Sequence, residues 1–246
     1  QEAILPIRAE ILLHLPDSFV LFKPKDIVSG DFFWFHHSGE ASIIVCADCT
    51  GHGVPGAFMS MICTDKLNHT VHEKEIFQPG SMLSEVNKGI KKSLKQENDD
   101  SVKTKDGMDA AICKIDPKRS SIIYSGANRP LWRVRNGELE EFKPTKCAVG
   151  GFTPEEQLFD EVEIPFEKGD CFYMSSDGFA DQFGGEKGKK MMVKNFKEKI
   201  LTIWKLPMDQ QMKELDLHFE TWKQYYDEYG EQYEQVDDVC VIGFRL

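Results

Sequence analysis

The chain has 246 residues, a net charge of −11 at neutral pH and 41% hydrophobic residues. The acidic balance argues against a nucleic-acid-binding protein, which needs a basic face for phosphates, and no apolar run approaches the roughly 20 residues of a membrane-spanning helix. Seven cysteines, an odd number scattered along the chain, favour reduced thiols packed in a core, in a cytoplasmic protein or the cytosolic part of a membrane-attached sensor.

The amino-terminal segment has apolar residues at helical spacing, interrupted by Pro6: Ile4, Ile7, Ile11 and Leu15. The pattern is compatible with a short covering helix or with the end of a linker helix from a preceding domain. We favour the second interpretation, with residues 1–16 as the linker end and residues 17–246 as one domain.

Short runs rich in β-branched and aromatic residues then dominate the chain and predict strands. They lie at residues 18–22, 42–47, 109–115, 120–126, 131–135, 159–164, 171–176 and 239–244. Asn136-Gly137 is a strong hairpin signal because both residues tolerate positive φ. Successive hairpins indicate antiparallel sheets.

Helical periodicity occurs in three blocks. One covers residues 55–71, a second follows Pro79, and a third lies near residues 212–222. The order of elements predicts an α+β fold in which helices cover antiparallel sheets. Residues 95–107 read as a polar loop, residues 182–192 as a glycine-rich flap, and residues 220–235 as a helix extension or a partner surface.

Aspartates stand beside turns at the ends of four apolar runs: Asp31, Asp48, Asp177 and the pair Asp237-Asp238. One such aspartate is often only a turn former. Four of them, if they converge, would repel one another unless a positive charge lies among them. Mg²⁺ and Mn²⁺ prefer oxygen ligands, so the pattern indicates a divalent metal site.

Six segments in this order carry a family resemblance: "SGDFFWF", "ADCTGHGVPGAFM", "GMDAAI", "SGANRPLWRVRNGELEEF", "SSDGFADQFGG" and "VDDVCVIGFRL". From about Ala3 to the end, the chain resembles the metal-dependent (PPM-type) serine/threonine protein phosphatases, specifically the bacterial SpoIIE/RsbU-type domains. The resemblance implies a four-layer α-β-β-α sandwich of two antiparallel sheets, with two Mn²⁺ or Mg²⁺ ions at one edge.

The resemblance also implies roles for the aspartates. Asp48 would bridge both metals and Cys49 would offer its backbone carbonyl. Asp31 would bind the second metal, and Asp177 and Asp237 the first. The four aspartates would then be the catalytic set.

Other residues near these motifs have less definite roles. Asp238 would support the ligands from behind, and Asp109 is either a ligand or a hydrogen-bond acceptor. Lys25 and Arg129 are candidates for phosphate binding, as is Lys23, although solvated surface lysines are the simpler explanation. A histidine two residues after the bridging aspartate acts as general acid in larger relatives; here that position is Thr50, and His52 is better explained as a turn residue.

The implied function is hydrolysis of phosphoserine or phosphothreonine on a regulatory protein by a water that two metals activate. The domain would be the output of a bacterial signalling protein and act on an anti-anti-sigma-type partner, with homodimerisation through the linker. One alternative is a degenerate binding module, against which the intact aspartate set argues. The other is a metal phosphodiesterase acting on nucleotides.

Overall fold

The computed structural model describes residues 1–39, 41–96, 105–226 and 230–246. After a short 3₁₀ turn η1 (Glu2–Ile4), the helices are α1 (Arg8–His14), α2 (Gly53–His72), α3 (Pro79–Ser93), α4 (Gly178–Asp181), α5 (Met192–Ile203) and α6 (Met208–Lys223). The strands are β1 (Ser18–Lys23), β2 (Asp31–Ser38), β3 (Ala41–Cys49), β4 (Gly107–Asp116), β5 (Ser121–Ala127), β6 (Leu131–Arg135), β7 (Glu138–Phe142), β8 (Val149–Gly150), β9 (Val162–Pro165), β10 (Cys171–Ser175), β11 (Phe183–Gly184), β12 (Lys189–Lys190) and β13 (Val239–Arg245). None of the helices in these ranges is both long and apolar enough to cross a bilayer.

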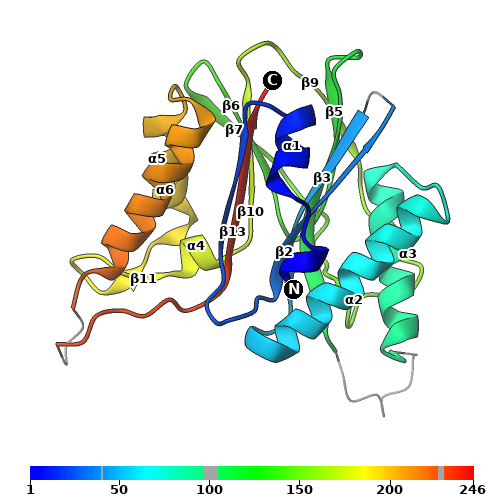
Figure 1. Ribbon diagram of the computed structural model, residues 1–246, viewed down its shortest axis with the longest axis horizontal. Coiled ribbons are helices and arrows are strands. Elements are labelled where there is room, and N and C mark those ends of the chain that lie inside the picture. The colour runs from blue at the N-terminus through cyan, green and yellow to red at the C-terminus, as the bar shows by residue number, and fades with distance from the viewer. Residues whose placement is uncertain (40, 97–104, 227–229) are drawn as a thin grey trace.

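Two antiparallel sheets stack in the middle of the molecule (Figure 1). The first has the strand order β2-β3-β4-β5-β9, with β8 paired to β4, and the second has the order β1-β13-β10-β6-β7. Helices α2 and α3 cover the outer face of the first sheet, and α5 and α6 cover that of the second. The predicted four-layer α-β-β-α sandwich is therefore confirmed.

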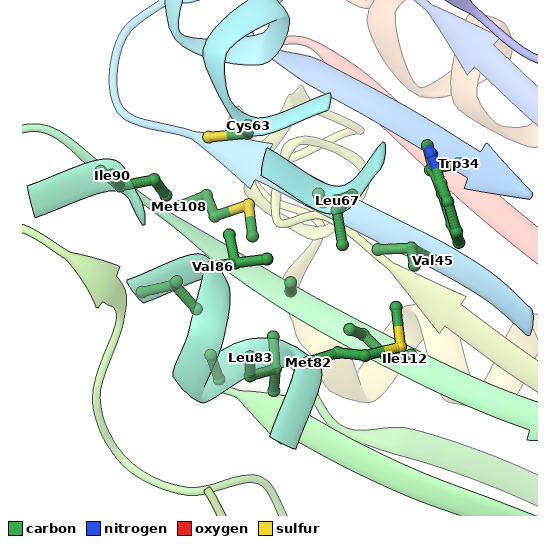
Figure 2. Packing of buried hydrophobic residues seen from close by; sticks show 14 of the residues in the cluster. Trp34, Val45, Cys63, Leu67, Met82, Leu83, Val86, Ile90, Met108 and Ile112 are labelled. Carbon is green, nitrogen blue, oxygen red and sulfur yellow. The ribbon is translucent and has the colours of Figure 1, made fainter. Parts of the chain in front are cut away.

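Three apolar cores lie between the four layers, so the central strands are buried on both faces. On β3, Val45 faces α2 and α3, whereas Ile44 and Cys46 face the second sheet. Figure 2 shows the core beneath the helices, where Leu67 and Leu83 point toward the strands. This double burial explains why the strand runs are continuously apolar rather than alternating.

The seven cysteines are all free thiols. Cys46, Cys113 and Cys240 lie between the two sheets, and Cys171 lies beneath α5 and α6. Their expected role as small core residues is confirmed.

The amino-terminal segment is not one continuous helix, since Pro6 separates η1 from α1. Ile11 and Leu15 are buried in the core between the sheets, while Ile7 and Leu13 are exposed. The helix therefore covers one end of the sandwich. Its assignment as the end of a linker remains a prediction.

Turn chemistry explains the most clearly predicted hairpin. Asn136 and Gly137 have φ of 52° and 86° and join β6 to β7, as expected for a two-residue turn of this composition. Most of the polar loop predicted at 95–107 lies outside the described residues, as do residues 227–229 of the segment that follows α6.

Truncation of Leu83 in α3 tests the core under the helices. The side chain is fully buried, so Leu83→Ala should lower the free energy of unfolding by about 2 to 5 kcal/mol. The matched control is Leu217→Ala in α6, whose side chain is 60% exposed and should change stability by less than about 0.5 kcal/mol. Urea unfolding of both variants measures the difference, and equal stabilities would contradict the assigned packing.

Candidate active site

The topology of the first sheet brings three aspartates to one edge. Asp31 begins β2, Asp48 lies near the end of β3, and Asp109 lies near the start of β4. The antiparallel register places Asp31 opposite Asp48 and Asp48 opposite Asp109. Directly opposite residues share one face of a sheet, so the three side chains form a row across three strands.

Strand alternation decides which face this row occupies. Asp31, Asp48 and Asp109 have the same parity as Phe33, Cys46 and Ala111 on their strands, which face the second sheet. The row therefore lies where the core between the sheets ends.

The second sheet meets this row with two further aspartates. Asp177 lies two residues after the end of β10 and Asp237 two residues before the start of β13, and these two strands are neighbours. The backbone N–H of Asp177 lies 3.4 Å from Asp48 Oδ2, which joins the two sheets at the site. A cleft of about 230 Å³ opens here, lined by Asp48, Cys49, Thr50, Gly51, His52, Met108, Asp109, Arg129, Ala148, Asp177 and Asp237.

Arg129, which follows β5, supplies a positive charge in the cleft. Its Nη2 atom lies 2.7 Å from Asp48 Oδ2, 2.7 Å from Asp177 Oδ2 and 3.2 Å from Asp109 Oδ2. Asn128 Nδ2 donates a second hydrogen bond to Asp109, at 2.8 Å. Arg129 was predicted only to bind phosphate, and its contact with three carboxylates was not predicted.

Burial raises the pKa of the acidic groups in the cleft. Desolvation raises the pKa of Asp48 to about 7, although the charge of Arg129 opposes the shift. Desolvation likewise raises the pKa of Asp109, again against Arg129. The three carboxylates drive the pKa of Arg129 upward despite its own burial, so its guanidinium stays charged.

Asp31 lies behind the cleft rather than in its lining. Its side chain is 3% exposed, and Oδ2 has no hydrogen-bond partner among the described residues. Desolvation and the charge of Asp48 raise the pKa of Asp31 well above its usual value. A buried, unpartnered carboxylate oxygen is costly unless a cation or donor completes its shell.

Asp237 and Asp238 are adjacent in sequence but lie in different environments. Asp238 is buried, and its two carboxylate oxygens accept hydrogen bonds from the backbone N–H groups of Lys25 and Gly30, each at 2.7 Å. Asp237 lines the cleft and accepts a bond from the backbone N–H of Asp238. Asp238 therefore holds the approach to β2 in place, while Asp237 faces the site.

The loop after β3 depends on close backbone approaches that only glycine allows. A Cβ on Gly30 would lie 2.3 Å from the carbonyl oxygen of Gly51, and one on Gly56 would lie 2.2 Å from the same atom. The thiol of Cys49 points away from the cleft and lies 3.8 Å from Cys63 Sγ beneath α2. Cys49 therefore lines the cleft through its backbone.

His52 lines the cleft and contacts Lys25, whereas Lys23 is turned toward α6. Lys23 Nζ is held by Asp216 and Glu220 of α6, at 2.6 and 2.8 Å. The half-exposed ring of His52 contacts Asp26 Oδ2 at 3.0 Å and Lys25 Nζ at 3.2 Å. His52 makes no side-chain cap of α2, so its contacts tie the loop to residues 25–26.

The glycine-rich segment predicted as a flap forms the small β11–β12 hairpin, packed on α6. A Cβ on Gly184 would lie 2.0 Å from the Trp222 carbonyl oxygen, and the Gly185 N–H donates to that oxygen at 2.9 Å. Glycine is required here for close packing. The motion over substrate that the flap prediction implied remains untested.

Thr50 is a site residue that sequence reasoning did not assign. Its hydroxyl donates to the Gly107 carbonyl at 3.2 Å and accepts from the Gly107 N–H at 3.1 Å, which fixes the start of β4 beside the end of β3. Its position two residues after Asp48 was noted only for the histidine that it replaces.

Carboxylate oxygens are the ligand type that hard divalent cations prefer, and Asp31 Oδ2 offers a buried oxygen without a partner. In the described part of the chain, however, no group of three or more His, Cys, Asp or Glu side chains is already arranged to hold a metal ion. The cleft thus has suitable donors, but Arg129 occupies the position between three of them.

Comparison with known proteins identifies the family. The family model described as Stage II sporulation protein E (SpoIIE) matches residues 38–246. No match is found among curated proteins.

Several solved structures share the fold. The SiaA-PP2C domain of Pseudomonas aeruginosa matches with a TM-score of 0.85 and 28% identity, covering 100% of this chain and 91% of that one. The PP2C phosphatase domain of Bacillus subtilis SpoIIE, solved with a fragment of its regulatory domain, matches with a TM-score of 0.71 and 17% identity, over 94% and 63% of the two chains. RsbX in complex with magnesium matches with a TM-score of 0.61 and 18% identity, over 93% and 94%. The chain therefore belongs to the SpoIIE family, and its fold is that of the PP2C/PPM serine/threonine phosphatases.

Proposed function

We propose that this protein is a metal-dependent phosphatase that hydrolyses phosphoserine or phosphothreonine on a regulatory protein. The observation that carries the proposal is the convergence of carboxylates from both sheets on one small cleft. Asp48 and Asp109 come from the first sheet and Asp177 and Asp237 from the second. Such a concentration of acidic groups needs positive charge, and a phosphate ester that approaches it needs still more.

The residues present fit Mn²⁺ or Mg²⁺, which prefer hard oxygen donors. Asp48 would contact both ions, Asp31 the second ion, and Asp177, Asp237 and the Cys49 carbonyl the remaining positions. When bound, two such ions supply an activated water and stabilise the oxygens of an in-line displacement at phosphorus. The match to RsbX, solved in complex with magnesium, supports this choice of metal.

The protein's own residues have separable tasks in this proposal. The carboxylates position the cations, and the buried Asp238 holds the loop of residues 25–30 against the site. Arg129 is the guanidinium nearest to where a phosphoryl group would lie, and arginine suits phosphate oxygens through its planar donors. Lys25, beside His52 at the entrance, would add attraction for an anionic substrate.

A regulatory phosphoprotein, of the anti-anti-sigma type, is the proposed partner. The solved SpoIIE relative is described as a cell fate determinant, which supports a role in regulation. Dimerisation through the segment of residues 1–16 is part of the same proposal, since Ile7, just before α1, and Leu13, within it, are exposed.

The central test is hydrolysis of an aryl phosphate with and without Mn²⁺. We expect Asp48→Asn and Asp177→Asn to lower the rate by at least about a hundredfold, because each removes a charged oxygen from the metal shell. Asp65→Asn is the matched control: this exposed aspartate on α2 pairs with the neighbouring Lys66, does not line the cleft, and should leave the rate unchanged.

Activity that persists in both site variants would refute the metal assignment. Folded protein that binds Mn²⁺ but hydrolyses no phosphopeptide would favour the binding module. Hydrolysis of cyclic dinucleotides in preference to phosphopeptides would favour the phosphodiesterase.

Adjacent aspartates provide a second test. Asp238→Ala should lower the free energy of unfolding by about 1 to 3 kcal/mol, because two backbone N–H groups lose their acceptor. Asp237→Ala should change stability less but weaken Mn²⁺ binding. Thermal unfolding and calorimetric titration of the pair separate the roles, and a reversed pattern would exchange the two assignments.

Metal affinity should also depend on pH. A carboxylate binds a metal only when ionised, and burial raises the pKa of Asp48 to about 7. Because most of this group is protonated at pH 6 and ionised at pH 8, the Mn²⁺ dissociation constant should fall by about tenfold over that range. Calorimetric titrations at pH 6, 7 and 8 measure it, and a constant affinity would contradict the role of Asp48.

A further inference from the structure

One nitrogen atom of Arg129 contacts carboxylates from two sheets. Its Nη2 lies within 2.7 to 3.2 Å of one oxygen from each of Asp48, Asp109 and Asp177. Two of these aspartates are neighbours across β3 and β4, and the third follows β10. The guanidinium therefore occupies the centre at which these three carboxylates meet.

A guanidinium nitrogen and a divalent cation cannot occupy this centre together. Mn²⁺ and Mg²⁺ hold carboxylate oxygens at about 2.1 Å, which is closer than any of these N···O contacts. Both cations also satisfy the same electrostatic need, since either one offsets repulsion among the carboxylates. A metal that binds Asp48 and Asp177 must therefore displace the Arg129 side chain.

The backbone of Arg129 is fixed while its side chain is held only at its tip. The Tyr124 hydroxyl donates to the Arg129 carbonyl at 2.6 Å, and the Arg129 N–H donates to the Ala127 carbonyl at 2.7 Å. By contrast, Nε is buried and has no hydrogen-bond partner among the described residues. Because its backbone is held, a displaced Arg129 side chain would stay at the cleft. In its new position Nε could gain a hydrogen-bond acceptor.

We propose that Arg129 is a resident counter-ion that competes with the divalent metal for Asp48, Asp109 and Asp177, and that metal binding releases its guanidinium to bind the phosphoryl group. The inference rests on the proposed function, because it needs a metal at these carboxylates. It assigns Arg129 two alternating sets of partners: carboxylates in the metal-free protein and phosphate oxygens in the metal-loaded one. Metal binding and phosphate binding are then coupled through one side chain.

The first experiment measures Mn²⁺ affinity by calorimetry, which does not depend on turnover. Arg129→Met removes the competing cation while keeping an unbranched chain, so Mn²⁺ should bind at least about tenfold more tightly than to the wild type. Arg119→Met is the charge-matched control, because this exposed arginine pairs with Asp116 and does not line the cleft, and the Mn²⁺ affinity of the variant should equal that of the wild type. Arg129→Lys keeps a competing positive charge, so it should tighten Mn²⁺ binding by less than Arg129→Met does.

Thermal unfolding supplies an independent readout. Metal-free Arg129→Met should melt at a lower temperature than the wild type, because three carboxylates lose their cation, and saturating Mn²⁺ should raise its melting temperature by more. If Arg129→Met does not fold without metal, the comparison of Arg129→Lys with the wild type carries the test.

The second experiment measures binding of orthophosphate to the Mn²⁺-loaded proteins. The wild type should bind it at least about tenfold more tightly than Arg129→Met, because a charge-assisted bidentate contact is lost. Equal phosphate affinities would overturn the release of the guanidinium to phosphate.

The outcomes also separate this inference from the proposed function. Mn²⁺ affinity that is equal or weaker in Arg129→Met would overturn the competition while leaving a metal-dependent phosphatase in place. Failure of every variant to bind Mn²⁺ would overturn both. Binding to Arg129→Met but not to the wild type would support the competition in its strongest form.

Discussion

Repulsion among carboxylates at the open end of the inter-sheet core is the constraint that the rest of the site must satisfy. The fold places Asp31, Asp48 and Asp109 in one row and adds Asp177 from the facing sheet. Burial makes their charges expensive, since little water remains to screen them. Either a cation or protonation of the carboxylates must relieve this repulsion, and Arg129, after β5, lies among three of them.

The surrounding loops hold these aspartates in place. Asp238 ties the approach to β2 to the start of β13, and the glycines around Gly51 let the loop after β3 lie directly against β2. Gly178 permits the same closeness on the other sheet, where a Cβ would lie 2.0 Å from the Asp238 carbonyl oxygen. The site is thus positioned by contacts to the backbone.

Much of this architecture can be predicted from the sequence because local patterns report burial. The apolar runs mark strands covered on both faces, Asn136-Gly137 marks a hairpin, and the aspartates mark strand ends. The register that sets Asp31 opposite Asp48 could not be obtained in the same way, because it depends on pairing between strands and not on either strand alone.

The position of Arg129 shows a second limit on what can be predicted from the sequence. A sequence contains the charge of an arginine but not its partners, and long side chains have many rotamers. The expectation of phosphate binding came from residue type and motif position. Its contact with Asp48 and Asp177 depends on residues 81 and 48 positions away in the chain.

The place of β13 in the second sheet has a consequence for the order in which the protein folds. This strand lies between β1 and β10, so β1 has no partner in the second sheet until β13 pairs with it. Asp237 and Asp238 arrive with it, and Asp238 bonds to Gly30, 208 positions earlier. Contacts of such long range form late and slowly. Until β13 pairs, Asp31 and Asp48 therefore lie without the completed cleft, because Asp237 is not yet in place.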